Sequence, residues 1–199
     1  MPRTFPGFEA LYQLQDPLLD EPFRGHFNLP FAVIQSIMVG EQIPNEPVPV
    51  FRAMGGDLWE VIWGDQIGAV AVAERVVDLL EEQGFSGWAT YPVAVSDEEG
   101  QLIPGYFGLS VTGRCGPIDY HRGRLIEIDS PIPRYLGLYF DPDSWDGSDL
   151  FFADRGRPFV VAEVKEALER AGVRNLTFTP LLAVRTPQIA VDGIPGDKS

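Results

Sequence analysis

The clearest pattern of apolar and polar positions runs through residues 57–95 and returns in residues 149–184. In both stretches an Asp-Leu-aromatic sequence precedes a Gly-containing turn, an apolar run, a helical pattern and a closing apolar segment with a proline. The helical pattern ends at Gly84 in the first stretch and at Gly172 in the second. Glycine readily adopts the left-handed conformation that ends a helix. The pattern therefore predicts one β-hairpin–helix–strand module used twice.

Each predicted helix has one apolar face at helical spacing. These faces are formed by Val76, Val77, Leu79 and Leu80 in the first helix and by Val164, Ala167, Leu168 and Ala171 in the second. The alanines expected at the two helix starts, Ala73 and Ala162, offer no side-chain acceptor for capping. We therefore expect burial against a sheet to stabilise both helices.

Further strands are predicted from alternating apolar residues. They span residues 8–14, 105–112, 124–128 and 135–140, and in the first of them Phe8, Ala10, Tyr12 and Leu14 are expected on one face. Residues 31–38 fit either a short helix or a buried strand. The prolines at 30, 44, 47 and 49 argue against a long helix or a central strand in this part of the chain.

These elements predict the α+β class, with a mostly antiparallel sheet built from two similar β-hairpin–helix–strand modules. We expect residues 1–50 to form an irregular N-terminal segment packed on the core. Residues 51–184 are expected to form a single α+β domain with the internal pseudo-repeat (57–95 and 149–184). Residues 185–199 are expected to form a mobile tail.

Composition narrows the possible partners. The 199 residues include 29 acidic and 15 basic ones, which gives a net charge of −14 and a pI of about 4.4. Nucleic-acid binding needs a basic surface, so we expect no nucleic-acid partner. No apolar stretch is long enough to span a membrane, and the N-terminal residues lack the apolar region expected of a secretory signal. With a single cysteine, these features predict a cytoplasmic protein without disulfides.

The sequence contains no phosphate-binding loop, dinucleotide fingerprint or zinc-protease motif, so we predict no cofactor, metal or catalytic residue. Cys115 and His121 are close enough in sequence to pair as nucleophile and base, although a small buried cysteine is the more common case. The acidic loop 141–149 fails the EF-hand spacing, because Trp145 and Phe152 occupy ligand positions five and twelve.

Three motifs carry a resemblance to a known family. They are an Asp-Leu-aromatic sequence before each hairpin, a Gly-aromatic or Asn-containing turn after each helix, and Gly-Arg-Cys-Gly at residues 113–116. With them, residues 50–184 resemble the eleventh immunity-protein family of bacterial polymorphic toxin systems, once catalogued as a domain of unknown function. Members often have Ser at the helix start, where this chain has Ala73 and Ala162. The resemblance implies a non-enzymatic cytoplasmic protein that binds and neutralises a cognate protein toxin, and it carries over no catalytic residues.

The residues expected to bind the partner lie in two acidic segments that include one aromatic residue. They are Asp97, Glu98, Glu99, Asp141, Asp143, Trp145 and Asp146. If the toxin is basic, these carboxylates should accelerate encounter. Two alternatives stay open: a small hydrolase or transferase that uses a pair of carboxylates, and a dimerisation or scaffold module. The oligomeric state is not determined by the sequence.

Overall fold

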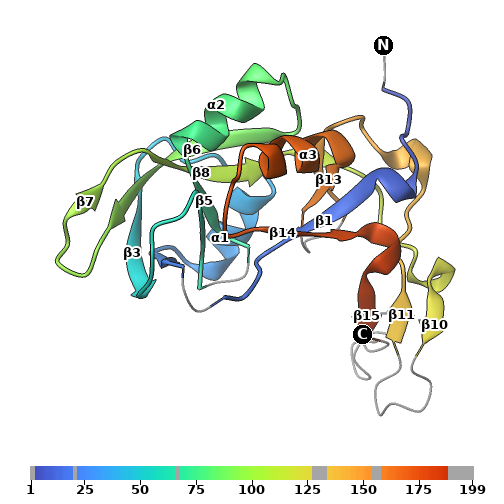
Figure 1. Ribbon diagram of the computed structural model, residues 1–199, viewed down its shortest axis with the longest axis horizontal. Coiled ribbons are helices and arrows are strands. Elements are labelled where there is room, and N and C mark those ends of the chain that lie inside the picture. Colours follow the sequence, from blue (N-terminus) through green and yellow to red (C-terminus); the bar gives the residue numbers. More distant parts are fainter. Residues whose placement is uncertain (1–2, 20–21, 66–67, 127–133, 154–157, 188–199) are drawn as a thin grey trace.

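The computed structural model describes residues 3–19, 22–65, 68–126, 134–153 and 158–187 (Figure 1). Helices and β-sheets are mixed along the chain, which confirms the α+β class. Strand pairing in the described residues is antiparallel except for the parallel pairs β3–β6 and β9–β12, so the expected predominance of antiparallel pairing is also confirmed. None of the described helices is long and apolar enough to cross a membrane.

The largest sheet has the strand order β2-β3-β6-β8-β5-β4, with β7 paired to β6. Its strands are β2 (Arg24–Phe27), β3 (Val48–Met54), β4 (Val61–Trp63), β5 (Val70–Ala73), β6 (Trp88–Ser96), β7 (Leu102–Ile103) and β8 (Tyr106–Val111). A bridge between Gly25 and Gly64 joins the two edge strands and closes the sheet on itself. A Cβ at Gly25 would lie 2.5 Å from Val50 Cγ1, so glycine is needed there. The closed sheet encloses an apolar interior that includes Val50, Ile62 and Val95.

Two smaller sheets follow along the long axis of the molecule (Figure 1). The five-stranded sheet has the order β14-β1-β13-β12-β9, with β1 (Leu11–Gln15), β9 (Gly113–Arg114), β12 (Leu150–Phe152), β13 (Phe159–Val161) and β14 (Thr177–Pro180). The three-stranded sheet β10-β11-β15 projects from one end and contains β10 (Arg124–Ile126), β11 (Arg134–Leu136) and β15 (Arg185–Pro187). Among the described residues are also the 3₁₀ turns η1 (Phe8–Ala10), η2 (Tyr120–Arg122), η3 (Pro142–Ser144) and η4 (Leu181–Ala183).

Helices α2 (Glu74–Glu82) and α3 (Ala162–Arg170) each begin directly after a β-hairpin and lie together over the sheets (Figure 1). Neither helix has a side-chain cap at its start, as expected. Helix α3 begins at Ala162, so the residue in the capping position is Val161 and not Ala162. Both helices are followed by glycine with positive φ, 67° at Gly84 and 64° at Gly172, which confirms the predicted stops. The buried residues Val76, Val77, Leu80, Val164, Ala167 and Leu168 anchor the two helices to the core.

The N-terminal third is more regular than predicted. Helix α1 (Phe31–Met38), β1 and β2 all lie within residues 1–50, so the expectation of an irregular segment is wrong. Strand β1 starts only after the 3₁₀ turn η1, which breaks the predicted alternation, and Leu11 rather than Tyr12 is fully buried. Strand β1 pairs with β13 and β14, which come from the far end of the chain. Local periodicity carries no information about such distant partners.

Pro49 lies in β3, an internal strand between β2 and β6, contrary to the expectation that prolines exclude a central strand there. The carbonyl of Pro49 accepts a hydrogen bond from the amide of Asn28 (3.0 Å). Because proline has no backbone N–H, it cannot donate a hydrogen bond to β2, and the pairing with β2 ends at this residue. The proline is therefore tolerated near the start of the strand.

The predicted strands at 124–128 and 135–140 are shorter than expected, and residues 127 and 128 lie outside the described residues. The tail expected to be mobile from residue 185 instead begins with β15, which pairs with β11. Residues 188–199 of that tail lie outside the described residues.

Candidate partner-binding surface

The two predicted acidic segments lie far apart in the fold. Residues 97–100 form the turn between β6 and β7, at one extreme of the long axis in Figure 1. Residues 141–149 connect β11 to β12, toward the opposite end. The structure therefore does not join them into one acidic patch, and each needs its own interpretation.

Trp145 belongs to the core and not to an exposed binding surface. Its side chain is buried, and its indole N–H donates to the Ser148 carbonyl (3.0 Å). Its ring lies 5.8 Å from that of Phe5 and 6.0 Å from that of Phe151. The buried ring leaves little of Trp145 for the expected partner contact, because it packs among aromatic rings of the core.

Two aspartates of the same loop hold its backbone. Asp146 accepts hydrogen bonds from the amides of Arg114 (2.7 Å) and Ser148 (2.9 Å). Asp141 accepts from the amide of Asp143 (3.1 Å) and begins the turn η3. The Asp143 carboxylate is exposed and has no hydrogen bond or ion pair within the described residues. Of this segment, Asp143 is the residue most available to a partner.

The acids of the β6–β7 turn are more exposed. Asp97 accepts a hydrogen bond from the Gln101 amide (2.8 Å) and so shapes the turn. Glu98 lies 3.6 Å from Arg52, but 66% of its side chain is exposed, which leaves a weak surface ion pair. Glu99 is exposed. Two of these three carboxylates are thus free to meet a partner at little structural cost.

The recurrent motifs meet at one junction between the sheets. The amide and hydroxyl of Ser86 donate to the buried Asp149 carboxylate (2.9 and 2.8 Å), which also pairs with Arg3. A Cβ at Gly87 would lie 2.1 Å from the Leu150 carbonyl oxygen, and one at Gly113 would lie 2.2 Å from it. The motifs that carry the family resemblance therefore hold the two sheets in close contact.

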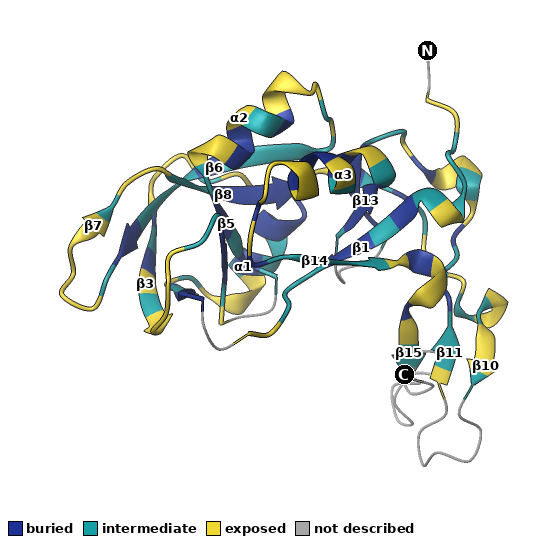
Figure 2. Ribbon diagram, in the orientation of Figure 1, coloured by how far each residue is buried: buried dark blue, intermediate teal, exposed yellow. Residues whose placement is uncertain are grey.

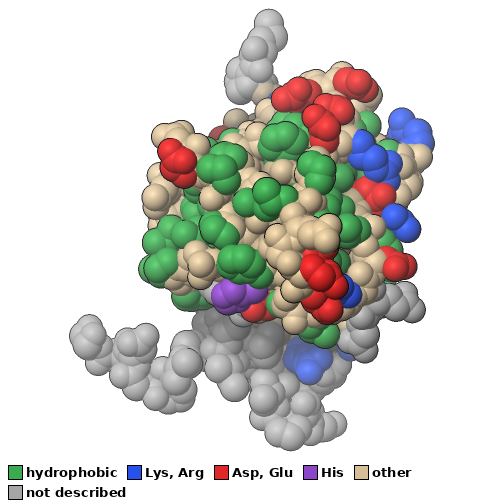
Figure 3. Space-filling model, turned by 90° about the vertical axis from the view of Figure 1, so that its left-hand side faces the viewer, with side chains coloured by type: hydrophobic (Ala, Val, Ile, Leu, Met, Phe, Trp, Pro, Cys, Tyr) green, Lys and Arg blue, Asp and Glu red, His purple; other side chains and the backbone are tan. Residues whose placement is uncertain are grey.

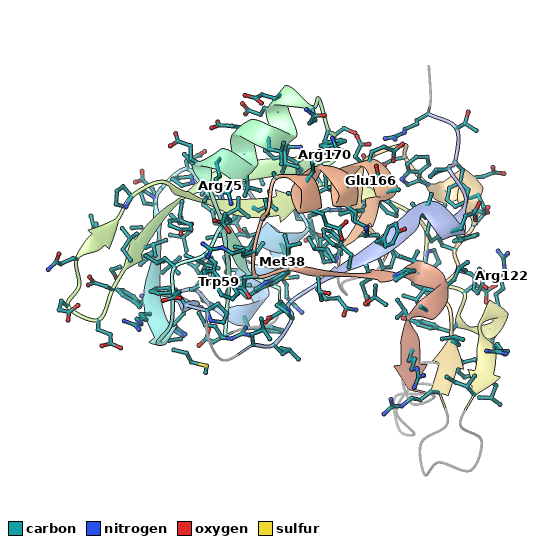
Figure 4. The ribbon with its side chains drawn as sticks, viewed as in Figure 1. Met38, Trp59, Arg75, Arg122, Glu166 and Arg170 are labelled. Atoms are coloured by element: carbon teal, nitrogen blue, oxygen red, sulfur yellow. The ribbon has the colours of Figure 1, made fainter. Side chains whose placement is uncertain are left out.

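A second polar cluster links the helices. Glu60 is paired with Arg75 (2.7 Å) and Arg174 (3.2 Å). Arg75, labelled in Figure 4, also donates to the carbonyls of Ala171 and Gly172, directly after α3. Burial raises the pKa of Glu60, but hydrogen bonds from Arg174 and Arg75 outweigh it and lower the pKa to about 2. Arg174 also stacks over Trp59, with 5.3 Å between its guanidinium carbon and the ring centroid. The two arginines keep Glu60 ionised. Glu60 is therefore suited to linking these elements by ion pairs and not to donating a proton.

The other features weighed as chemistry belong to the fold. Cys115 is buried and its amide donates to the Phe152 carbonyl (2.9 Å), whereas His121 lies exposed on η2. An apolar cavity between the helices and sheets is lined by core residues such as Leu80, Leu150 and Leu168. Within the described residues no cluster of three or more metal-ligating side chains is found.

One sheet face lacks a cover. Helix α2 packs on the outer face of the large sheet over β5 and β8, where Leu109 and Val111 are buried. Beyond it, Phe51 of β3 and Leu102 of β7 are exposed. Figure 2 shows β7 and the end of β3 as exposed, in contrast to the buried β5 and β8.

The register of the strands identifies the side chains of this uncovered face. His26, Phe51, Ser96 and Leu102 are cross-strand partners in one row across β2, β3, β6 and β7. Pro49 and Ala94 form the next paired positions on the same face. We call the set Pro49, Phe51, Ala94, Ser96 and Leu102 the open face.

The open face contains no charged residue, although it points away from the buried interior. Phe51 is 45% exposed and Leu102 is 72% exposed. Figure 3 shows hydrophobic side chains gathered over this end of the molecule, with acidic ones toward its margins. Ser96 lies between Phe51 and Leu102 in register and is buried, and its hydroxyl has no hydrogen-bond partner within the described residues.

Sequence reasoning missed Phe51 and Leu102. The available signal was that β3 is apolar on both faces, since Val48 and Val50 point inward while Pro49 and Phe51 point outward. That signal requires a strand assignment in a stretch whose prolines argue against one. It also requires knowing that α2 covers only part of the sheet.

The comparisons with known proteins place these observations in a family. A family model described as "Immunity protein family (Imm11)" matches residues 2–182. The match includes the N-terminal strands and nearly all of the three sheets. No curated protein matches the chain significantly.

Proposed function

The chain belongs to the Imm11 immunity protein family, and on that premise we propose that it binds a cognate bacterial toxin and neutralises it by direct contact. The observation that carries the proposal is the extent of the match, which covers residues 2–182 of 199. An immunity protein protects the cell that makes the toxin, so we propose that it acts in the cytoplasm of that cell.

The surface of the protein supports neutralisation by binding. A net charge of −14 favours rapid encounter with a cationic protein. The open face supplies exposed apolar area, which is typical of interaction sites when it occurs away from a core. Together they provide what a tight protein–protein contact needs: an apolar centre and charged surroundings.

The carboxylate-dependent enzyme is the less favoured alternative. General acid catalysis at neutral pH needs a carboxyl group whose pKa is raised by burial or by another carboxylate. Glu60 is the carboxyl with the clearest shift in the described residues, and its pKa is lowered to about 2. Arg75 and Arg174 hold it as a carboxylate, so Glu60 is a poor candidate for an acid or a base. We therefore propose a non-catalytic protein.

Co-expression tests the proposed function. The gene next to the one for this chain is expressed from an inducible promoter in a bacterial host, with or without this protein. We expect the neighbour to arrest growth alone, and the full-length chain to restore growth and co-purify with the neighbour's product. A toxic neighbour that this chain neither binds nor neutralises would overturn the proposal, and so would a neighbour without toxicity.

We also propose that the scaffold is one module used twice. The orders β4-β5-α2-β6 and β12-β13-α3-β14 are the same, and in each case one antiparallel strand separates the hairpin from the closing strand. That strand is β8 in the first copy and β1 in the second. Pro92 pairs with Phe107 and Pro180 pairs with Tyr12 at equivalent places.

Backbone conformation supports the same correspondence. Gly84 and Gly172 both have positive φ, and so do Gly87 and Asn175 three residues later. The helix starts, Glu74 and Ala162, have the same separation as the two glycines. The Val-Ala-Glu sequences at residues 72–74 and 161–163 are displaced from this spacing by one residue. The apolar faces of the helices, and not the identity of individual residues, therefore set the alignment of the proposed copies.

A further inference from the structure

We propose that the open face, with the acidic turn beside it, is the docking site for a cationic surface of the toxin. The inference rests on the proposed function and adds the location of the contact and the chemistry of the partner. The partner is a folded protein domain that presents an apolar centre flanked by lysine or arginine side chains.

The open face is apolar in composition. A sheet face that meets water usually carries polar side chains. Here five outward positions of β3, β6 and β7 are Pro49, Phe51, Ala94, Ser96 and Leu102, and none of them is charged. Exposed apolar area of this kind is costly in water and is kept where a partner covers it.

Carboxylates lie beside the open face. Glu98 and Glu99 project from the turn that ends β6, directly after Ser96. On the other side Asp65 holds His26 through a 2.8 Å contact at the end of the same row. A cationic partner would meet carboxylates at both ends of the row, which fits the acidic excess of the whole chain.

The Ser96 hydroxyl is a buried polar group within the open face. A buried hydroxyl without a hydrogen bond is uncommon and costs free energy. Ser96 is flanked by Phe51 and Leu102 in the register. Its neighbour Leu102 belongs to a two-residue strand on a hairpin that extends from the body (Figure 1). If a partner displaced the Leu102 side chain, it could form a hydrogen bond with the Ser96 hydroxyl at the centre of the apolar contact.

Charge also argues against a second copy of this chain as the occupant. Pairing two open faces would bring the carboxylates of two acidic turns together, on chains that each carry a net charge of −14. Like charges across an interface oppose association. A cationic protein meets no such opposition.

The test compares charge substitutions of equal size on and off the face. Phe51→Lys and Leu102→Lys, singly and together, are set against Leu125→Lys in β10 at the other end of the molecule. Leu125 is 41% exposed, close to the 45% of Phe51, so the control adds the same charge at a similarly exposed apolar site. Thermal unfolding of each variant verifies that it folds.

The probe is the purified product of the neighbouring gene, and affinity is measured against the full-length chain. We expect each face variant to raise Kd by about tenfold or more, as for apolar residues central to an interface. We expect Leu125→Lys to change Kd by less than about twofold, as for residues outside an interface. Growth protection in the co-expression assay should fall in the same order.

The outcomes separate the two proposals. If the wild-type chain binds the probe and both face variants bind equally well, the docking site is overturned and the proposed function stands. If the wild-type chain fails to bind or protect, the proposed function falls and the docking site with it. If light scattering shows a dimer that Phe51→Lys dissociates, the open face is a contact between copies and the toxin-docking proposal is wrong.

Discussion

The segments 97–100 and 141–149 are both rich in acidic residues and differ in how the fold uses them. Both are acidic turns between strands. In the second, Trp145 is buried and Asp146 accepts two backbone hydrogen bonds. In the first, Glu98 and Glu99 extend from the surface beside the open face.

The difference lies in the hydrogen bonds that the carboxylates of each segment accept within the fold. A carboxylate bound to two backbone amides cannot turn to a partner without leaving those amides unsatisfied. A carboxylate with only a weak surface ion pair can do so at almost no cost. We therefore propose that the 141–149 segment serves mainly stability and that the β6–β7 turn serves binding.

The largest effect should come from Trp145. Trp145→Ala removes a buried indole that contacts the rings of Phe5 and Phe151, and should lower the free energy of unfolding by about 3–5 kcal/mol. Leu102→Ala, at an exposed site in the other region, should change it by less than about 0.5 kcal/mol. Urea denaturation measures both. Equal losses in the two variants would break the distinction between the two regions.

Glu60 gives the next largest effect and serves as a reference for a carboxylate engaged by the fold. Its folded pKa of about 2 lies below the ordinary value of 4.5, so ionised Glu60 stabilises the native state. This stabilisation is complete above pH 4.5 and is lost as the pH falls toward 2. Because Arg75 and Arg174 are half exposed, we expect a contribution of about 1–3 kcal/mol.

The measurement compares the wild-type chain with Glu60→Gln in urea at several pH values. At pH 7 the variant should be less stable, and the difference should shrink as the pH falls below 4. A difference that does not change with pH would show that Glu60 acts through packing and not through its charge.

An effect of similar size separates two aspartates within residues 141–149. Asp146→Ala removes the acceptor for the amides of Arg114 and Ser148, and should lower the free energy of unfolding by about 1–3 kcal/mol. Asp143→Ala removes an exposed carboxylate and should cost less than about 0.5 kcal/mol. Chemical denaturation of the two variants under the same conditions provides the comparison. A greater loss in Asp143→Ala would reverse the assignment of structural roles.

The smallest effect on stability is expected at the β6–β7 turn. Replacing Glu98 and Glu99 by Gln should leave the free energy of unfolding within about 0.5 kcal/mol of the wild-type value. The same double variant should slow association with the toxin by about two- to fivefold at low salt. Stopped-flow kinetics should show that the difference fades at high salt, since exposed charges are screened. Identical rates at low salt would show that the turn does not guide encounter.

Local patterns were sufficient for the elements whose partners are close in sequence. Helices α2 and α3, their terminal glycines and the hairpins before them follow from spacing and from the conformational freedom of Gly84 and Gly172. The α+β class follows from the same elements.

Long-range pairing set the limit of prediction. Strand β1 is placed between β13 and β14, and β3 is made internal by β2 and β6, through contacts that no local window contains. The candidate site depended on the same information. Phe51 could be recognised as an outward residue only after its register with His26 and Ser96 was known, and Trp145 could be recognised as buried only from its ring contacts.

Hydrogen–deuterium exchange of the chain with and without the neighbouring gene's product tests the central claim most directly. The open face and its acidic turn should gain protection on binding, in peptides that cover β3 and residues 94–103. Residues 141–149 should exchange at the same rate in the free and bound states. Protection confined to residues 141–149, with residues 94–103 unchanged, would contradict the account.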